Sequence, residues 1–596
     1  MAKIPGYAGQ YLEIDLTSKS IKKVPLDQNL ARYYIGGRAM GGKILLDAYG
    51  TNWGKVDPLS PEALLIFNTG PFAPFVASRM NVVFKSPLTN GIVGSQISGD
   101  FHAEMRFSGY DGIIVKGKAS SPVYVTIFDD KVEIKDASKW WGKETKETME
   151  LIMNEYGHQT SQLYIAPGGE NLCKIACVMA DWYRAAGRGG GGAVMGSKNL
   201  KALICKGNGP APEVADQKKV DALTEWTRLN SAIVRQSTHE YGTTAGIYTT
   251  GNTRSSEPVK NWQSEWHDQK QIQGVYFAAE QWVRRYWADM CCTVACSKLG
   301  RVKYGKRAGQ IAELPDYEAG ALEGTNLAVY DISDMVFLTD LPDRYGLDLI
   351  SLGNVVGWAC EAQEKGILTA ADLGGVQLKW GEADGFAKLM ELIAYRKGDI
   401  PKLLGDGLLA TTKKLGKGAE FAVICKGMEL GAHGTRSLQD KDELGYTVSA
   451  MGGDHVSTVI ADREDRFVAD STGQCTFLGL TRDQEVEILQ ATTGFGITKD
   501  ELEKQLVYRW TTANRIPLLL AGWTYKDDVN PPRFYEPLPD GPYKGKFTDK
   551  TIEDTKKQAY YKSQGWDTQG VPTTDTLKKC GLDAFDGALA PLRAKA

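Results

Sequence analysis

Four consecutive glycines, Gly189 to Gly192, constrain this chain more than any other feature, because they stand between basic residues in the segment Arg184–Lys198. Glycine lacks a Cβ atom, so such a run lets the backbone approach another group closely, and successive peptide N–H groups can bind an anion. The segment has no GxxxxGK[ST] pattern and is therefore not a P-loop. Its regular alternation of arginine, glycine and small apolar residues favours phosphate or pterin binding over a flexible surface loop.

A second constraint is a cluster of cysteines. Three of the ten cysteines, Cys291, Cys292 and Cys296, lie in one short segment that begins at Asp289. Thiolates are the preferred ligands of iron–sulfur clusters, and one short loop can present two or three of them. Buried structural thiols are the alternative. A cluster would need a further ligand from elsewhere in the chain, and Cys475 is the candidate.

Two segments carry candidate acid–base residues. Glu318 ends the run Pro315-Asp316-Tyr317-Glu318, and His455 follows a Gly-Gly pair and Asp454. Glutamate and histidine are common proton carriers in catalysis. Each of the six histidines, taken alone, is more often structural than catalytic.

Length and charge narrow the class of protein. A chain of 596 residues predicts several domains, and its net charge of −3 gives no electrostatic reason for a nucleic-acid partner. No apolar run reaches the roughly 18–20 residues that a membrane span needs. The N-terminus lacks the apolar stretch of a signal peptide, so the default location is cytoplasmic.

The pattern of apolar residues changes along the chain. Residues 1–207 contain short strand-like runs, such as 11–16 and 20–24 around a turn, and 124–128 and 131–134 around Asp129-Asp130. A linker with Pro210 and Pro212 follows, and beyond it segments such as 315–366 and 481–495 are helical in pattern. We place a second boundary near residue 415.

Further motifs connect these features to a known family. Arg79–Thr89 contains a strand with two cations, and two Asp-x-x-Gly motifs occupy Asp343–Asp348 and Asp470–Cys475. With the glycine segment and the ending Tyr560–Trp566, they occur in an order that resembles the aldehyde:ferredoxin oxidoreductase family, the tungsten- or molybdenum-dependent bis-pterin oxidoreductases. The resemblance covers essentially the whole chain.

The resemblance implies an α+β fold. A β-rich, saddle-like pterin-binding domain spans 1–207. Two mainly α-helical domains follow. Residues 208–415 hold the cluster loop and the first Asp-x-x-Gly motif, and 416–596 hold the second motif and the fourth cluster ligand.

The resemblance also implies cofactors: a tungsten or molybdenum bis-pterin, one [4Fe-4S] cluster, and Mg²⁺ bridging the pterin phosphates. Its metal-cluster ligands are Asp289, Cys292, Cys296 and Cys475, and its acid and base are Glu318 and His455. Its cofactor-binding residues, near the pterin phosphates or rings, are Arg79, Gln96, Arg184, Ala185, Gly187, Arg188, Gly189, Asp343, Gly346, Leu347, Asp348, Asp470, Gly473 and Gln474.

Three positions depart from the family pattern. Asp289 stands where the first cluster cysteine is usual; a carboxylate can bind iron, and recruitment of Cys291 is the alternative. Gln96 replaces an asparagine common at the magnesium site. Phe337 replaces a glutamate that bridges subunits through a metal in some members, which weakens that form of homodimer.

The expected reaction is oxidation of an aldehyde to a carboxylic acid, with electrons passing singly through the cluster to ferredoxin or an iron–sulfur subunit. The alternative is low-potential reduction of an aromatic or unsaturated acyl-CoA. Some such relatives hold the metal with a protein cysteine, and no cysteine occurs between residues 297 and 359. A third, non-enzymatic possibility is an electron-transfer or cofactor-storage subunit.

Overall fold

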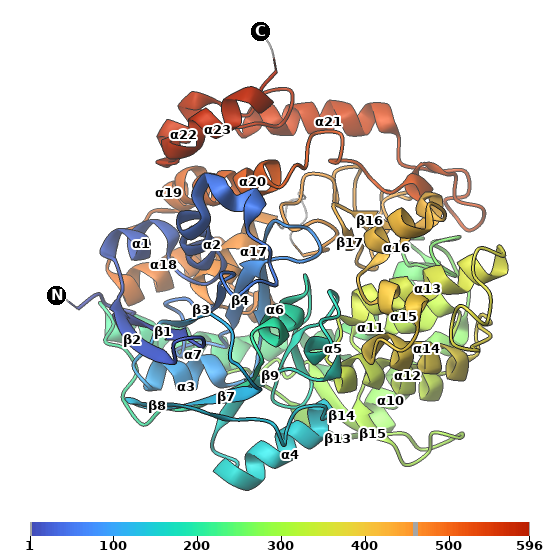
Figure 1. The fold of residues 1–596 in the computed structure, drawn as a ribbon, viewed down its shortest axis with the longest axis horizontal. Coiled ribbons are helices and arrows are strands. Elements are labelled where there is room, and N and C mark those ends of the chain that lie inside the picture. The colour runs from blue at the N-terminus through green and yellow to red at the C-terminus, as the bar shows by residue number, and fades with distance from the viewer. Residues whose placement is uncertain (1–2, 457–462, 595–596) are drawn as a thin grey trace.

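The computed structural model describes residues 3–456 and 463–594, and its N-terminal part is built on two six-stranded sheets (Figure 1). In the first sheet only β1 and β6 are parallel. Its order is β2 (Ser20–Pro25), β1 (Gln10–Asp15), β6 (Gly112–Lys116), β3 (Leu65–Thr69), β4 (Met80–Lys85) and β5 (Ile92–Ile97).

The second sheet is also mixed, with β7 and β12 parallel. Its order is β11 (Arg184–Ala186), β10 (Val178–Ala180), β9 (Ser161–Tyr164), β12 (Leu200–Lys206), β7 (Val123–Phe128) and β8 (Lys131–Asp136). The predicted hairpins around residues 17–19 and around Asp129-Asp130 are both present. Asp129 adopts a φ of 52°, a left-handed conformation that aspartate tolerates in turns.

One apolar core joins the two sheets. Phe67 and Phe84 of the first sheet belong to the same buried cluster as Val125 and Leu203 of the second. Burial of such side chains is the main favourable term in folding. Two helices complete this region, α2 (Gly37–Tyr49) against β3, β4 and β5, and α3 (Phe101–Phe107) against β9 and β12. The β-rich N-terminal domain is therefore confirmed.

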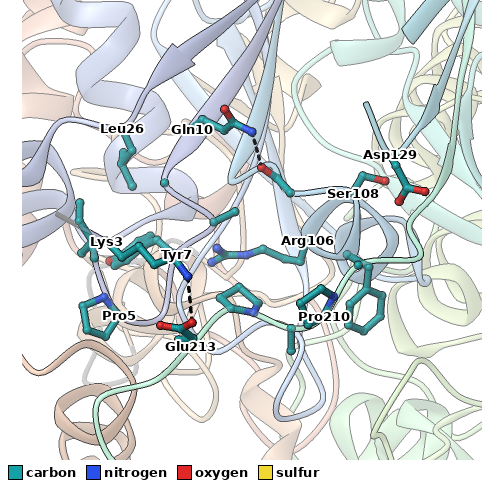
Figure 2. Close-up of a pocket in the computed structure, with 18 of the residues that line it drawn as sticks. Lys3, Pro5, Tyr7, Gln10, Leu26, Arg106, Ser108, Asp129, Pro210 and Glu213 are labelled. Carbon is teal, nitrogen blue, oxygen red and sulfur yellow. Dashed lines mark hydrogen bonds and ion pairs between the residues drawn. The ribbon is translucent and has the colours of Figure 1, made fainter. Parts of the chain in front are cut away.

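Helices dominate after residue 207, as predicted. The segment between β12 and the helix α7 (Gln217–Val234) has no helix or strand and lines a surface hollow of about 910 Å³ (Figure 2). In it, Lys3 pairs with Glu213 at 2.9 Å, so this linker is held against the N-terminal segment. None of the predicted site residues lines this hollow.

The helical region has an element that the sequence pattern did not predict. The cysteine segment lies between strands of a three-stranded sheet, β13 (Val283–Trp287), β14 (Ser297–Arg301) and β15 (Ile311–Glu313). The other elements that surround the site are α8 (Gln236–Tyr241), α11 (Tyr317–Ala319), α12 (Ile332–Tyr345), α13 (Leu349–Glu364), β16 (Ile424–Cys425), β17 (Met428–Glu429) and α17 (Arg463–Thr472).

The remaining helices include α6, which begins within the run of four glycines, and a C-terminal layer, α21 to α23, along the top of Figure 1. Buried Asp528 anchors the segment before this layer, because Lys426 and Arg515 approach it at 3.0 and 2.7 Å. Across residues 3–456 and 463–594, every helix is too short or too polar to span a bilayer. These remaining helices are α1 (Gln28–Tyr34), α4 (Thr145–Tyr156), α5 (Pro167–Glu170), α6 (Gly191–Ser197), α9 (Ile247–Asn252), α10 (Gly274–Gln281), α14 (Ala383–Ala394), α15 (Asp399–Leu404), α16 (Leu408–Leu415), α18 (Arg482–Thr493), α19 (Lys499–Glu501), α20 (Tyr508–Leu520), α21 (Lys550–Ser563), α22 (Thr574–Cys580) and α23 (Asp586–Leu589).

Candidate functional site

The loop between β13 and β14 presents Asp289 to two buried partners. Its Oδ1 atom accepts a hydrogen bond from the Gly99 N–H at 3.1 Å and lies 3.3 Å from Arg184 Nε. Its carbonyl accepts the Cys292 N–H at 3.1 Å, which closes a turn. Burial alone would raise the pKa of Asp289, but Arg184 and Arg79 outweigh it and hold that pKa below its usual range. Asp289 is therefore an anion inside the protein.

Cys475 joins this loop from a distant part of the chain. Its N–H donates to the Ala77 carbonyl at 3.1 Å, which fixes it beside the start of β4. Burial and the nearby Cys475 raise the pKa of the Cys296 thiol to about 11, against the opposing effect of Arg184 and Arg79. Burial raises the pKa of Cys292 as well, with Cys475 and Asp289 contributing. The structure thus brings together all four residues predicted to surround a cluster.

Cys291 has a different surrounding. Its φ of 61° is left-handed, and its Sγ atom lies 3.7 Å from the Pro74 carbonyl oxygen. The side chain is exposed, and the pKa of its thiol is raised by burial and then by Asp100, with no contribution from the other three cysteines. Asp289 thus acts electrostatically on Cys292, whereas Cys291 contacts the Pro74 carbonyl.

The glycine loop is explained mainly by packing of the protein on itself. A Cβ atom on Gly190 would lie 2.3 Å from the Lys174 carbonyl oxygen, and one on Gly192 would lie 2.3 Å from the Cys177 carbonyl oxygen. Gly189 and Gly190 also adopt φ values of 87° and 91°. At Gly187, in contrast, a Cβ atom would meet nothing within 4 Å. Close approach to a ligand is thus available at Gly187. Gly190 and Gly192 allow contact with neighbouring backbone, and Gly189 and Gly191 make room for the side chains of Val93 and Phe84.

The residues flanking the glycines point toward different partners. Arg184 reaches the cluster loop, and Ala185 pairs with Met179 between β10 and β11. Arg188 is buried, and its Nε donates to Asp348 Oδ2 at 2.9 Å. The loop therefore connects the cluster loop with the first Asp-x-x-Gly motif.

The first Asp-x-x-Gly motif also forms the turn between helices α12 and α13. Gly346, with a φ of 66°, ends α12, and the Asp348 carboxylate begins α13 by accepting the Ile350 N–H at 3.0 Å. Glycine and aspartate are preferred at these two helix ends. Leu347 forms a bridge with Ala176, next to the glycine loop. Asp343 lies in the last turn of α12, where burial raises the pKa of its carboxyl well above the usual range.

The second motif begins in the last turn of α17 and continues beyond its end. Asp470 Oδ1 lies 2.8 Å from Arg466 Nε, and its carbonyl accepts the Asn81 side-chain amide at 2.8 Å. The Gly473 carbonyl accepts the Arg79 N–H at 2.9 Å, and the Gln474 carbonyl accepts the Gln96 side-chain amide at 3.1 Å. Hydrogen bonds from backbone and side-chain amides therefore hold this motif against the first sheet.

Several buried polar atoms along this contact have no hydrogen-bond partner within residues 3–456 and 463–594. We call their residues the seam: Arg79 (Nε), Asn81 (Oδ1), Gln96 (Oε1), Arg188 (Nη1) and Gln474 (Oε1). A buried polar atom without a partner costs about 1–3 kcal/mol. Unpaired buried atoms also occur elsewhere in these ranges, for example on Glu257 and Glu323. These five lie between β4, β5, the glycine loop and the second motif, where a polar bound group such as a pterin with its phosphates could pair with them.

The acid–base residues form a separate buried group. Glu318 Oε2 accepts the Ala432 N–H at 2.8 Å, and its Oε1 lies 3.4 Å from His455 Nε2. A third member, His433, lies 3.0 Å from the same Oε1 atom, and its ring stacks on that of His455 at 5.5 Å. Sequence reasoning singled out Glu318 and His455 and left His433 among the unassigned histidines, because its only sequence signal is an isolated His between small residues.

The protonation states of this group follow from its charges. Burial would raise the pKa of Glu318, but His455 and His433 lower it to about 2. Burial would lower the pKa of His433, but Asp440 and Glu318 raise it to about 9. Burial lowers the pKa of His455 to about 4, although the negative charge of Glu318 acts to raise it. Arg188 interacts electrostatically with Glu318 and Asp348, so this group lies beside the glycine loop.

Comparison with known proteins agrees with the motif order. Residues 11–207 match the N-terminal domain of aldehyde ferredoxin oxidoreductase, and residues 222–582 match its domains 2 and 3. The WOR-like subunit of an aliphatic sulfonate oxidoreductase from Pyrococcus furiosus is 40% identical, with 97% of each chain covered. A tungsten-containing aldehyde ferredoxin oxidoreductase from the same organism is 33% identical over 97% of this chain and all of its own length.

A solved structure shares the whole fold. It is the active site complex BamBC of benzoyl coenzyme A reductase with 1,5-dienoyl-CoA, with a TM-score of 0.82 and 22% identity over 99% of each chain. At that identity the likeness shows the fold alone. From the two family matches and the relatives above 30% identity, the chain belongs to the aldehyde ferredoxin oxidoreductase family and is an oxidoreductase.

Proposed function

We propose that this chain is a tungsten bis-pterin enzyme that oxidises an aldehyde to a carboxylic acid and passes electrons through a [4Fe-4S] cluster to ferredoxin or an iron–sulfur subunit. One observation carries the proposal: in a single loop, Arg184 contacts Asp289 of the cluster group, and Arg188, which donates to Asp348, interacts electrostatically with Glu318 of the acid–base group. The seam of unpartnered polar atoms belongs to the same region. Tungsten is favoured over molybdenum because the curated relatives at 32–33% identity are named as tungsten enzymes.

The residues present fit the proposed groups. Cys292, Cys296 and Cys475 offer thiolates to a cluster, and Asp289 offers a carboxylate oxygen that is already ionised. Arg79 and Gln96 would hold pterin phosphates and their Mg²⁺, because both keep a buried polar atom unpaired. When bound, the tungsten–pterin group would supply the two-electron redox chemistry.

The protein's own contribution would be proton transfer and orientation. Glu318 is ionised at neutral pH, so it can accept a proton from water or substrate. His455 is neutral at that pH and can donate a hydrogen bond to the aldehyde oxygen. Asp348 and Asp470 would contact the pterins only through atoms left free by their protein partners, since each already binds arginine.

A second substrate class is favoured by one comparison. The relative at 40% identity is named for aliphatic sulfonates, so a sulfonate-bearing substrate is our second candidate. The proposal that the chain reduces an aromatic acyl-CoA is supported only by the similarity of fold to the benzoyl coenzyme A reductase complex. A homodimer also stays a proposal.

Turnover with a one-electron dye separates these possibilities. We expect anaerobically purified protein to reduce the dye with aliphatic or aromatic aldehydes as donors. Preference for a sulfonate donor would select the second candidate. Dye reduction with neither class, in protein with a full metal complement, would contradict the proposed function.

A further inference from the structure

His433 lies between two carboxylates. Its Nε2 atom is 3.0 Å from Glu318 Oε1, and its Nδ1 atom is hydrogen-bonded to Asp440 Oδ2. The side chains of all three retain at most 21% exposure, so water screens these charges weakly. An imidazolium would place its positive charge between these two carboxylates, 3.0 Å from Glu318 Oε1, whereas a neutral ring would supply no charge to either.

The contacts on either side favour this charged form. Asp440 is ionised, because its partner His433 lowers the pKa of its carboxyl against the effect of burial. Arg254 lies 3.8 Å from Asp440 on the outer side and Lys441 also acts on it, but neither replaces the short contact to His433. The row Glu318–His433–Asp440 therefore alternates negative, positive and negative.

We propose that His433 and Asp440 form a charged dyad that keeps Glu318 a carboxylate and its neighbour His455 a neutral imidazole, which assigns the base to Glu318 and the hydrogen-bond donor to His455. The inference rests on the proposed function for the roles of Glu318 and His455. His433 and Asp440 are positioning residues in it, since they act through Glu318.

The stacked histidine pair explains the division of roles. The His433 and His455 rings lie 5.5 Å apart with 18° between their planes. A second positive charge on His455 would be opposed by the first, and His433 contributes to the lowered pKa of His455 after burial has acted. Gly431 makes this arrangement possible, because a Cβ atom there would lie 2.5 Å from His455 Cβ.

Other titratable groups face the pair without changing the assignment. The Tyr317 ring lies 4.9 Å from the His433 ring, and the Tyr446 hydroxyl donates to the His433 carbonyl at 3.0 Å. Burial raises the pKa of both tyrosines well above the usual range, so they stay neutral. The remaining charged or titratable neighbours are Asp454 and Arg188 beside His455, and Glu257 with its partner His267 beyond His433.

The charge states can be measured without turnover. The chain has six histidines, so ¹³Cε1-histidine labelling of the oxidised holoenzyme gives six signals, which single substitutions assign. We expect the His433 signal to stay in the imidazolium range at pH 7 and to titrate near pH 9, and the His455 signal to stay neutral from pH 6 upward. A neutral His433 or a charged His455 at pH 7 would overturn the dyad, whether or not a substrate is known.

Substitutions then test what the charge does. An opposite charge at this distance typically shifts a carboxyl pKa by about 1–3 units. His433→Gln should therefore move the acidic limb of the kcat/KM profile upward by about that amount. Asp440→Asn should instead move the titration of His433 below pH 9, because it removes one of the two carboxylates that raise that pKa. His433→Lys keeps a positive charge at this position and should return the acidic limb of the kcat/KM profile to its lower pH. A purely structural role of His433 would not predict that return.

Exposed His158 supplies the matched control, and His158→Gln should leave both the profile and the other histidine signals unchanged. An unchanged acidic limb in His433→Gln, with an imidazolium seen in the parent protein, would overturn the role of the dyad. Absence of turnover in the parent protein with every donor would instead count against the proposed function, and the histidine signals would still decide the charge assignment.

Discussion

The cluster group and the acid–base group are both partly buried, but their charges are balanced in different ways. In the acid–base group, the charge alternates from Glu318 through His433 to Asp440. Around Cys475 three thiols and Asp289 converge, and burial raises the pKa of Cys292 and Cys296. Nearby, Arg79 keeps its Nε atom without a partner within the described ranges.

This difference shows how the two groups would work. Thiols crowded in a buried place are costly as thiolates unless a metal binds them, so the cluster group is complete only with its cofactor. The acid–base group holds its ionisation states through its own residues. Loss of a metal should therefore disturb the first group and leave the protonation states of the second largely as they are.

The largest effect in the second group should come from the base itself. Glu318→Gln keeps the shape but cannot accept a proton, and general acid–base roles contribute about 10²–10⁴-fold in rate. We expect that loss in kcat, with metal and iron content unchanged. His455→Asn should cost less than Glu318→Gln, because it removes a hydrogen bond rather than the proton acceptor. Full activity in both variants would disprove the assignment.

The pH dependence of the parent enzyme follows from the same group. Because His455 and His433 hold the pKa of Glu318 near 2, the base is ionised above that pH and is lost only as pH falls toward it. We expect no acidic limb from this residue above about pH 4 in steady-state rates, a value two pH units above that pKa. An acidic limb near pH 6 in the parent rate profile, absent from Glu318→Gln, would contradict the claim that Glu318 is already ionised at that pH.

A smaller effect is expected in the first group at Asp289. Asp289→Cys should retain about four irons, as one cubane cluster needs, and shift the reduction potential, because ligand identity tunes such clusters. Cys291→Ser is the matched control and should change neither quantity, since Cys291 faces Pro74. Loss of iron in Cys291→Ser, with Asp289→Ala unaffected, would reverse the assignment of the ligand.

Much of this could be predicted from local patterns. The hairpin β1–β2, the glycine loop and the cysteine cluster are contiguous in sequence, and each has a residue pattern with a physical cause. Ligand binding by the glycine loop stays a prediction. The packing of Gly190 and Gly192 against the Lys174 and Cys177 carbonyls could not be predicted, because it depends on tertiary contacts.

What local patterns could not predict depends on long-range contacts. His433 meets Glu318 across 115 positions (433 minus 318), and Asp440 gains its role only through that contact. The sheet β13–β15 was missed because its strands are short and partly exposed, without a clear alternation. The domain boundaries near 207 and 415 stay predictions.

The central claim is that one tungsten–pterin group and one cluster complete the buried cluster group and the seam. Elemental and pterin analysis of the full chain, purified anaerobically from cells supplied with tungsten and molybdenum, tests it most directly. We predict about one tungsten and about four irons per chain, as a single cubane cluster requires. Iron without tungsten or molybdenum, or either metal without pterin, would contradict the account.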